Sequence, residues 1–226
     1  MKLVFLGDSL TWGGYGGSYV EALRRLMPEH EIINAGEGGN TAINLLRRLE
    51  SDVLSHDPDG VFVMVGGNDA ISFSQPKTRS YYRQGQQIDA GFVTIDDFET
   101  AYRELLSQLQ LAHVLVWIGL PPIEYNPTVV DTVRAYNERA REIARSFNVP
   151  VLDLMAAFAP PDIPERPPLD IGYILTIGKR EQTGWNAFDE AQREGGYSFT
   201  FDGMHLTPES AAQVAERIAA FIRARL

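Results

Sequence analysis

The chain has 226 residues, of which 20 are Lys or Arg and 30 are Asp or Glu, so its formal net charge is −10. Hydrophobic residues make up 44% of the sequence, which is enough for a sizeable core and excludes disorder as the dominant state. The acidic balance argues against nucleic acid as a partner, and the absence of cysteine excludes disulfides, zinc thiolate sites, iron–sulfur clusters and a cysteine nucleophile.

The first apolar run of the chain predicts a buried strand rather than a targeting segment. It extends only from Leu3 to Leu6, whereas a secretory signal needs an apolar stretch of ~7–15 residues and a membrane span needs ~18. We therefore expect no membrane span and, for the chain as given, a cytoplasmic location. A secreted form whose leader has been removed stays open.

Five short apolar runs predict the strands of a parallel sheet. They are rich in Val, Ile, Leu and Phe rather than alternating with polar residues, which is typical of strands covered on both faces. The predicted strands are Lys2–Leu6, Glu31–Asn34, Val61–Val65, Val114–Ile118 and Val149–Leu152.

Helical periodicity fills the segments between these strands. The predicted helices are Ser18–Met27, Asn40–Leu54, Asp97–Leu111, Val129–Phe147 and Thr207–Leu226. Thr207 is a good N-cap and Pro208 suits the first position of a helix, so the start of the last helix is well marked. Strand–helix alternation predicts a three-layer α/β/α sandwich around a five-stranded parallel sheet.

Two segments do not follow this alternation. Residues 70–95 are polar and aromatic, and residues 159–201 begin with several prolines and continue with aromatic side chains. Structureless loops longer than ~12–15 residues are uncommon in compact domains. We therefore predict one domain, 1–226, with two insertions. The insertions could shape a pocket or form a homo-oligomer contact, and the sequence does not separate these two roles.

Four polar motifs are predicted to meet at one edge of the sheet. In open parallel sheets, ligands bind outside the carboxyl ends of the strands. The motifs lie after the first three strands and before the last helix, and they are Gly7-Asp8-Ser9-Leu10, Asn34–Thr41, Gly66-Gly67-Asn68-Asp69 and Asp202-Gly203-Met204-His205. They would bring a hydroxyl, glycine amides, a side-chain amide, and an imidazole with a carboxylate to the same place.

These groups are the parts of a serine hydrolase. A serine hydroxyl such as that of Ser9 needs an adjacent base, and His205 can serve as that base if the carboxylate of Asp202 orients its ring. The oxyanion of the tetrahedral intermediate needs N–H donors, which the backbone of Ser9, the backbone of Gly39 and the side chain of Asn68 can offer. No metal and no cofactor are expected, so a chelator should be harmless.

Each motif also has an ordinary structural interpretation. A Gly-Asp-Ser sequence after a strand is commonly a turn with a helix cap, and the glycines can serve positive φ angles. Asp8 and Asp69 are expected to organise their turns, and Asp153 is a rival acid whose position suggests loop capping. His30, His56 and His113 have no comparable polar neighbours. The convergence of all four motifs favours the catalytic interpretation.

The four motifs resemble those of the GDSL esterase/lipase family, also called SGNH hydrolases. The resemblance implies a flavodoxin-like fold with Ser9 as nucleophile, His205 as base and Asp202 as its orienting acid. It also implies an oxyanion hole of Ser9, Gly39 and Asn68. Gly39, rather than Gly36 or Gly38, follows from matching Asn34–Thr41 to the second motif of the family. The two insertions have no counterpart in these motifs.

The predicted function is that of a serine esterase that hydrolyses small acyl esters through an acyl-enzyme. No long apolar lid segment is present, which disfavours triacylglycerols, whereas short-chain esters and acetylated carbohydrates fit better. Trp12 and Tyr15 follow the nucleophile and are candidate substrate contacts, although Trp12 could instead pack against the sheet. Acyltransferase activity and lysophospholipid or thioester substrates stay open.

Two other classes of protein also stay open. One is a flavodoxin-like ligand-binding module, which is weakened because no Gly-x-Gly-x-x-Gly or Walker-type lysine follows a strand. The other is an inactive hydrolase relative that only binds glycans. The presence of Ser9, Asp202 and His205 together argues against it.

Overall fold

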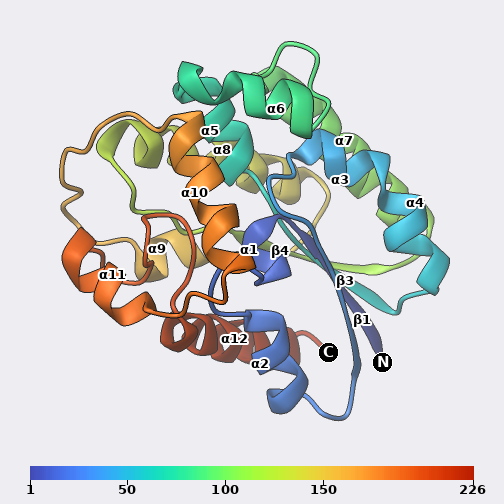
Figure 1. Ribbon diagram of the computed structural model, residues 1–226. Helices are drawn as coiled ribbons and strands as arrows, with labels where there is room; N and C mark the ends of the chain where they lie inside the picture. Colours follow the sequence, from blue (N-terminus) through green and yellow to red (C-terminus); the bar gives the residue numbers. More distant parts are fainter.

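The computed structural model describes residues 1–226, apart from the side chain at position 181. A five-stranded parallel sheet in the order β2-β1-β3-β4-β5 forms the centre of the molecule (Figure 1). Its strands are β1 Lys2–Gly7, β2 Glu31–Gly36, β3 Gly60–Met64, β4 Leu115–Leu120 and β5 Val151–Asp153. All five predicted strands are confirmed, and their bounds differ from the predicted ones by at most about two residues at either end.

Helices cover both faces of the sheet. They are α1 Ser9–Trp12, α2 Tyr19–Leu26, α3 Ala42–Arg47, α4 Leu49–Asp52, α5 Gly67–Ser74, α6 Arg79–Gly85, α7 Ile95–Leu111, α8 Pro127–Ser146, α9 Leu154–Phe158, α10 Ile171–Gln182, α11 Phe188–Gly195 and α12 Pro208–Arg223. Two short 3₁₀ turns, η1 Leu54–His56 and η2 Pro76–Thr78, complete the list.

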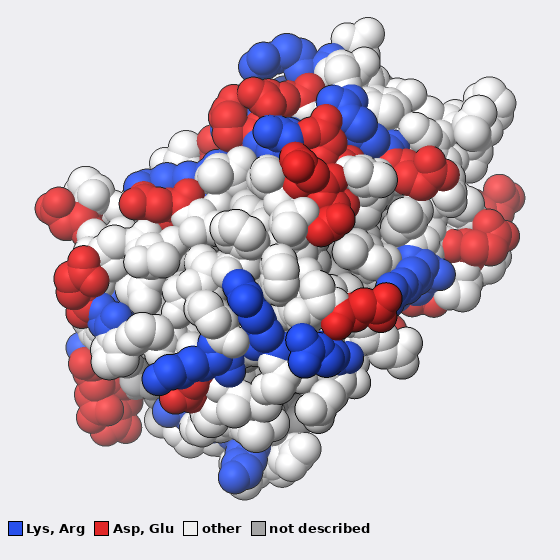
Figure 2. Space-filling view, turned by 90° about the horizontal axis from the view of Figure 1, so that it is seen from above, with Lys and Arg blue, Asp and Glu red and all other residues white. Residues whose placement is uncertain are grey.

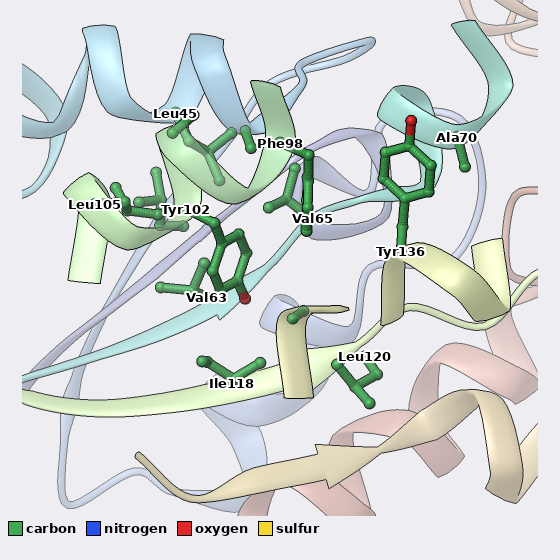
Figure 3. Packing of buried hydrophobic residues seen from close by; sticks show 14 of the residues in the cluster. Leu45, Val63, Val65, Ala70, Phe98, Tyr102, Leu105, Ile118, Leu120 and Tyr136 are labelled. Carbon is green, nitrogen blue, oxygen red and sulfur yellow. The ribbon is translucent and has the colours of Figure 1, made fainter. Parts of the chain in front are cut away.

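One face of the sheet packs against α3, α5, α7 and α8. Val63 of β3 and Ile118 of β4 point into this core, where they meet aromatic side chains of α7 and α8 (Figure 3). The Phe98 ring lies 5.1 Å from the ring of Tyr102 and 5.2 Å from that of Tyr136. The Tyr136 hydroxyl donates a hydrogen bond to the Val93 carbonyl over 2.6 Å, so this buried polar group is satisfied.

The opposite face packs against α2, α9 and α12. Because successive side chains of a strand point to opposite faces, Leu3 and Phe5 lie in this second core while their neighbours Val4 and Leu6 lie in the first. Phe5 meets the Tyr19 ring edge-on, with ring centroids 6.2 Å apart. The two cores confirm the predicted three-layer α/β/α sandwich.

The prediction of one continuous helix over Asn40–Leu54 is wrong. The segment forms α3, α4 and η1, and the chain turns at Arg48, whose φ of −106° and ψ of 9° lie outside the helical region. The Arg48 guanidinium is bound by the main-chain carbonyls of Gly7 and Ala35 at the carboxyl ends of β1 and β2. These tertiary hydrogen bonds override the helical periodicity of the sequence.

Both insertions contain helices. The first holds the end of α5, the η2 turn and α6, and the second holds α10 and α11. In Figure 1, α10 lies beside α5 and α1 near the carboxyl ends of the strands. Among the described residues, no helix is both long and apolar enough to span a membrane.

The surface carries acidic and basic side chains in close proximity. On the face shown in Figure 2, Asp and Glu are interspersed with Lys and Arg. Ion pairs also occur in the molecule, such as those of Glu99 with Arg103 and Arg139. Ion pairs that are open to solvent contribute little to stability, so the fold rests mainly on the two apolar cores.

Candidate active site

Ser9 lies two residues after the end of β1, and the tight turn that leads to it requires glycine at position 7. A side chain at Gly7 would place its Cβ 2.0 Å from Thr11 Oγ1 and 2.6 Å from the Met64 carbonyl oxygen. Asp8 then caps α1 by accepting a hydrogen bond from the backbone N–H of Leu10 over 3.0 Å. The turn leaves Ser9 as the first residue of α1, facing a cavity.

The structure brings Ser9, His205 and Asp202 into one chain of hydrogen bonds. His205 Nε2 lies 2.9 Å from Ser9 Oγ, and His205 Nδ1 lies 2.8 Å from Asp202 Oδ2. The other carboxylate oxygen, Asp202 Oδ1, accepts from the backbone N–H groups of Met204 and His205. Asp202 and the imidazole are almost fully buried, so water competes little for these bonds. A base oriented by a carboxylate can therefore accept the serine proton.

Glu124 fixes the loop that carries Asp202 and His205. Its buried carboxylate accepts backbone N–H groups of residues 198, 199 and 200 at 2.8–2.9 Å, and the Thr200 hydroxyl over 2.8 Å. The backbone N–H of Glu124 in turn donates to the Gly203 carbonyl over 3.0 Å. Glu124 was not singled out from the sequence. It follows β4, so the rule that ligands bind at the carboxyl ends of strands could have found it.

Three residues that line the cavity, Ser9 among them, are candidate sources of N–H donors for an oxyanion. Within the described part of the chain, no hydrogen bond takes up the backbone N–H of Ser9 or of Gly39. The third donor is the Asn68 side chain, whose Oδ1 accepts from the Tyr82 hydroxyl over 2.9 Å. This bond turns Nδ2 the other way, where it donates a hydrogen bond to Asp8 Oδ2 over 3.3 Å. Ser9, Gly39 and Asn68 all line the same cavity.

Gly39 adopts a conformation that a larger residue would not tolerate. Its φ is +80°, and a Cβ built on it would lie 2.1 Å from the Tyr81 hydroxyl and 2.6 Å from Gln86 Nε2. Gln86 also donates to the Gly38 carbonyl and accepts from the Asn40 side chain. The first insertion therefore holds the glycine loop in place.

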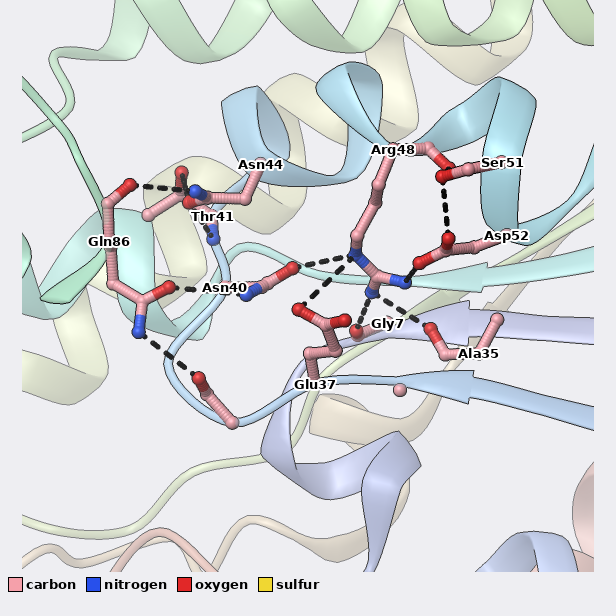
Figure 4. Close-up of polar contacts among 12 residues, drawn as sticks. Gly7, Ala35, Glu37, Asn40, Thr41, Asn44, Arg48, Ser51, Asp52 and Gln86 are labelled. Atoms are coloured by element: carbon pink, nitrogen blue, oxygen red, sulfur yellow. Dashed lines mark hydrogen bonds and ion pairs between the residues drawn. The ribbon is translucent and has the colours of Figure 1, made fainter.

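Arg48 ties this glycine loop to the sheet (Figure 4). Its side chain donates to Asn40 Oδ1 over 2.7 Å, to Asp52 over 2.9 Å, and to the carbonyls of Gly7 and Ala35 over 2.8 Å each. The planar guanidinium holds several N–H donors in fixed directions and so binds these four acceptors at once. A lysine ammonium would not reproduce this set of hydrogen bonds. Arg48 and Gln86 both position the site, and no motif in the sequence identified either of them.

Replacing Arg48 with alanine is expected to lower the free energy of unfolding by about 3 kcal/mol, because the change removes its hydrogen bonds to Asn40, Gly7 and Ala35 and leaves Asp52 without this ion-pair partner. Arg47→Ala is the matched control, since Arg47 is exposed and donates only to the Gln87 carbonyl. We expect it to cost less than about 1 kcal/mol. Urea unfolding of both variants checks this, and equal losses would contradict the role assigned to Arg48.

Two buried carboxyl groups stand next to the cavity, and burial raises the pKa of each. The pKa of Asp8 rises to about 6 and that of Asp69 to about 7. Asp69 accepts the backbone N–H of Ala42 over 3.0 Å and so joins α5 to the start of α3. Asp153 caps α9 through the Ala156 N–H and pairs with Arg141. All three carboxyl groups thus organise turns, as expected.

The two candidate substrate contacts differ in position. Tyr15 lines the cavity, and its ring meets the His205 ring edge-on at 5.1 Å. Trp12 lies one step further out, 37% exposed, with its ring 4.9 Å from that of Tyr15. The backbone of Trp12 also lies against Gly36 at the end of edge strand β2, so packing against the sheet edge and a role in substrate contact both stay open for Trp12.

The fold and this group of side chains define an α/β protein equipped like a serine hydrolase, and comparisons with known proteins agree. The model of the GDSL-like lipase/acylhydrolase family matches residues 5–213. The chain is 28% identical over 183 residues to an acetylxylan esterase of Geobacillus stearothermophilus, covering 70% of this chain and 77% of that protein. It is 31% identical over 161 residues to thioesterase 1/protease 1/lysophospholipase L1 of Escherichia coli K12, covering 66% and 64% respectively.

Solved structures show the same fold. An acetyl xylan esterase, AlAXEase, superposes with a TM-score of 0.67 at 21% identity, over 98% of this chain and 100% of that one. The chain belongs to the GDSL-like lipase/acylhydrolase family, which confirms the resemblance seen in the four motifs. It is a carboxylic ester hydrolase.

Proposed function

We propose that this protein hydrolyses short-chain acyl esters through an acyl-enzyme formed on Ser9. The observation that carries the proposal is the hydrogen-bonded series Ser9–His205–Asp202, which opens onto a cavity lined by Ser9, Gly39 and Asn68. A nucleophile, a base with its orienting acid, and donors for an oxyanion are the groups that ester cleavage requires.

In the first half-reaction, Ser9 Oγ attacks the ester carbonyl while His205 Nε2 accepts its proton. Asp202 stabilises the imidazolium through the bond to Nδ1. The carbonyl oxygen becomes an oxyanion and is bound by the N–H groups of Ser9, Gly39 and Asn68. The C–O bond then breaks, and the alcohol leaves with the proton that His205 returns.

In the second half-reaction, water takes the place of the alcohol. His205 deprotonates the water, the hydroxide attacks the acyl carbonyl, and the same donors hold the second oxyanion. Ser9 leaves with the proton from His205, and the acid is released. An alcohol that replaced water at this step would give acyl transfer, so an acceptor alcohol added at high concentration measures the partition between the two outcomes.

Carbohydrates that carry short acyl groups, acetylated ones among them, are the substrate class that the surroundings of Ser9 favour most. Trp12 and Tyr15 form an aromatic corner on the His205 side, where the alcohol must leave. A half-exposed indole can stack against a sugar ring, because it offers apolar surface while its N–H group stays accessible to water. The acetylxylan esterase relatives support the same class.

A panel of esters tests this function. We expect turnover of p-nitrophenyl acetate and of acetylated xylo-oligosaccharides, and much slower turnover of long-chain acyl thioesters and of lysophospholipids. Thioesterase and lysophospholipase are both in the name of the Escherichia coli relative. Comparable or faster rates on long acyl chains would overturn the assignment to short acyl esters.

Asn68→Ala is expected to lower kcat by about 100-fold with little change in KM. The lost amide binds charge that develops only in the transition state, and one such donor is typically worth ~2.7–4 kcal/mol of barrier. Steady-state kinetics on p-nitrophenyl acetate measure both constants. Tyr82→Phe is the graded control, because it keeps the amide and removes only the hydroxyl that orients it. It should cost far less, and a rise in KM at unchanged kcat in Asn68→Ala would contradict this role.

A further inference from the structure

One wall of the cavity beside Ser9 is apolar, and part of it comes from the second insertion. Ile174 and Ile177 of α10 line the cavity together with Ile71 of α5 and Ile123, which follows β4. None of these four side chains can donate or accept a hydrogen bond. A wall of this kind binds the hydrocarbon part of a ligand rather than its polar groups.

The helix that carries Ile174 and Ile177 is anchored to the site at two points. The Tyr173 hydroxyl donates to the main-chain carbonyl of Asp202 over 2.7 Å, and the Tyr173 ring meets Tyr125 edge-on at 5.4 Å. Just before the helix, the backbone N–H of Leu169 donates to the buried side chain of Gln75 over 2.9 Å. Both anchors join α10 to elements that form the site, so the wall has a defined position relative to Ser9.

The reaction geometry directs the acyl chain toward this wall. His205 must protonate the leaving alcohol, so the alcohol lies on the side of His205 and Tyr15. The carbonyl oxygen points to Asn68. Ile71 follows Asn68 by one helical turn and so shares its side of α5. Ile123 lies close by, since a Cβ on Gly67 would be 3.6 Å from Ile123 Cδ1.

The size of the cavity limits the chain. Its volume is about 60 Å³, while one water-sized group needs about 10–15 Å³. The whole cavity therefore holds about four to six such groups, which is an upper limit for the acyl group because the alcohol takes the side lined by His205 and Tyr15. A butanoyl group has five non-hydrogen atoms, and an acetyl group has three and leaves part of the apolar wall uncovered.

We infer that α10 is a specificity element, and that Ile177 with Ile174 sets the upper length of the acyl chain at about four carbons. This inference rests on the proposed function and adds to it the acyl part of the substrate. Each buried methylene favours binding about fourfold, and butanoate has two more methylenes than acetate, so butanoate is expected to exceed acetate in kcat/KM by about 15-fold at equal alcohol part.

Chain-length profiles of point variants test the inference. The probes are p-nitrophenyl acetate, butanoate, hexanoate and octanoate, and kcat/KM for each is expressed relative to acetate. Ile177→Trp fills the cavity, so its butanoate-to-acetate ratio should fall by about 15-fold. Ile177→Ala removes three carbons and makes room for about two methylenes, so its hexanoate-to-acetate ratio should rise by about 15-fold. Leu175→Ala, on the outer face of α10 and 54% exposed, should keep the wild-type profile.

The outcomes separate the inference from the proposed function. A wild-type protein that turns over none of these esters overturns the proposed function. An active wild type whose profile is the same in Ile177→Trp and Ile177→Ala overturns the inference and leaves the proposed function standing. Far-UV circular dichroism and thermal unfolding identify a variant that does not fold, and Ile174→Trp, at a half-buried position, then takes the place of Ile177→Trp.

Discussion

Ser9→Ala is expected to lower kcat on p-nitrophenyl acetate by roughly 10⁶-fold, because removal of the nucleophile of a working triad costs nearly the whole contribution of that triad. The fold should be unaffected, since Ser9 Oγ has His205 Nε2 as its hydrogen-bond partner and no role in either core. The thermal midpoint should therefore stay close to that of the wild type.

An exposed serine supplies the control for this change. Ser55 lies in η1, away from the four motifs, and Ser55→Ala should retain full activity. Measurement of kcat and of thermal unfolding for both variants separates loss of chemistry from loss of structure. Substantial turnover by Ser9→Ala, at a rate near that of the wild type, would remove Ser9 from the mechanism.

Asp202→Asn should lower kcat by about 10⁴-fold with the fold retained. The asparagine oxygen can still accept the N–H groups of Met204 and His205, so the loop keeps its shape. The amide nitrogen would then face His205 Nδ1, and a donor there forces the imidazole into the wrong tautomer to accept the Ser9 proton. The loss should appear in kcat at every pH where the protein is folded.

Asp153→Asn is the matched control, because it makes the same chemical change at the rival acid named from the sequence. Asp153 caps α9 and pairs with Arg141, so its variant should lose some stability and keep its kcat. The opposite pattern, with kcat lost in Asp153→Asn and retained in Asp202→Asn, would mean that the wrong carboxylate has been assigned to His205.

The sheet could be predicted from the sequence because each strand is a short run of large apolar residues buried on both faces. Residues such as Phe5 and Phe62 fill one core while Val4 and Val61 fill the other. Recognising such an apolar run requires no information from distant parts of the chain. The prediction of one helix over Asn40–Leu54 was wrong because the break depends on contacts far apart in the sequence. Arg48, where the helix breaks, binds carbonyls of β1 and β2, which no local pattern reveals.

The reacting groups could be predicted because the fold obeys a simple rule. The carboxyl ends of parallel strands meet at one edge, and Ser9, Gly39 and Asn68 follow three of them. The residues that support these groups could not be found in the same way. Gln86 and Glu124 act by binding backbone N–H and carbonyl groups, and such partners leave no recognisable motif in the sequence.

The sequence left two roles open for the insertions, shaping a pocket or forming a homo-oligomer contact. In the structure, both insertions lie at the cavity. Tyr81 and Gln86 of the first insertion surround the Gly39 loop, and α10 of the second lines the cavity itself. Their helices were not predicted as elements, because the prolines and polar residues around them obscure helical periodicity. The family motifs could not help, since both segments lie between the motifs.

Labelling with a fluorophosphonate, followed by peptide mapping, tests the activation of Ser9 most directly. The reagent reacts with a serine hydroxyl only where a base withdraws its proton, and it needs no knowledge of the natural ester. We predict one phosphonyl adduct per chain, on Ser9, with none in Ser9→Ala and strongly slowed labelling in His205→Asn. An unlabelled wild-type protein, or an adduct on another residue, would contradict the account.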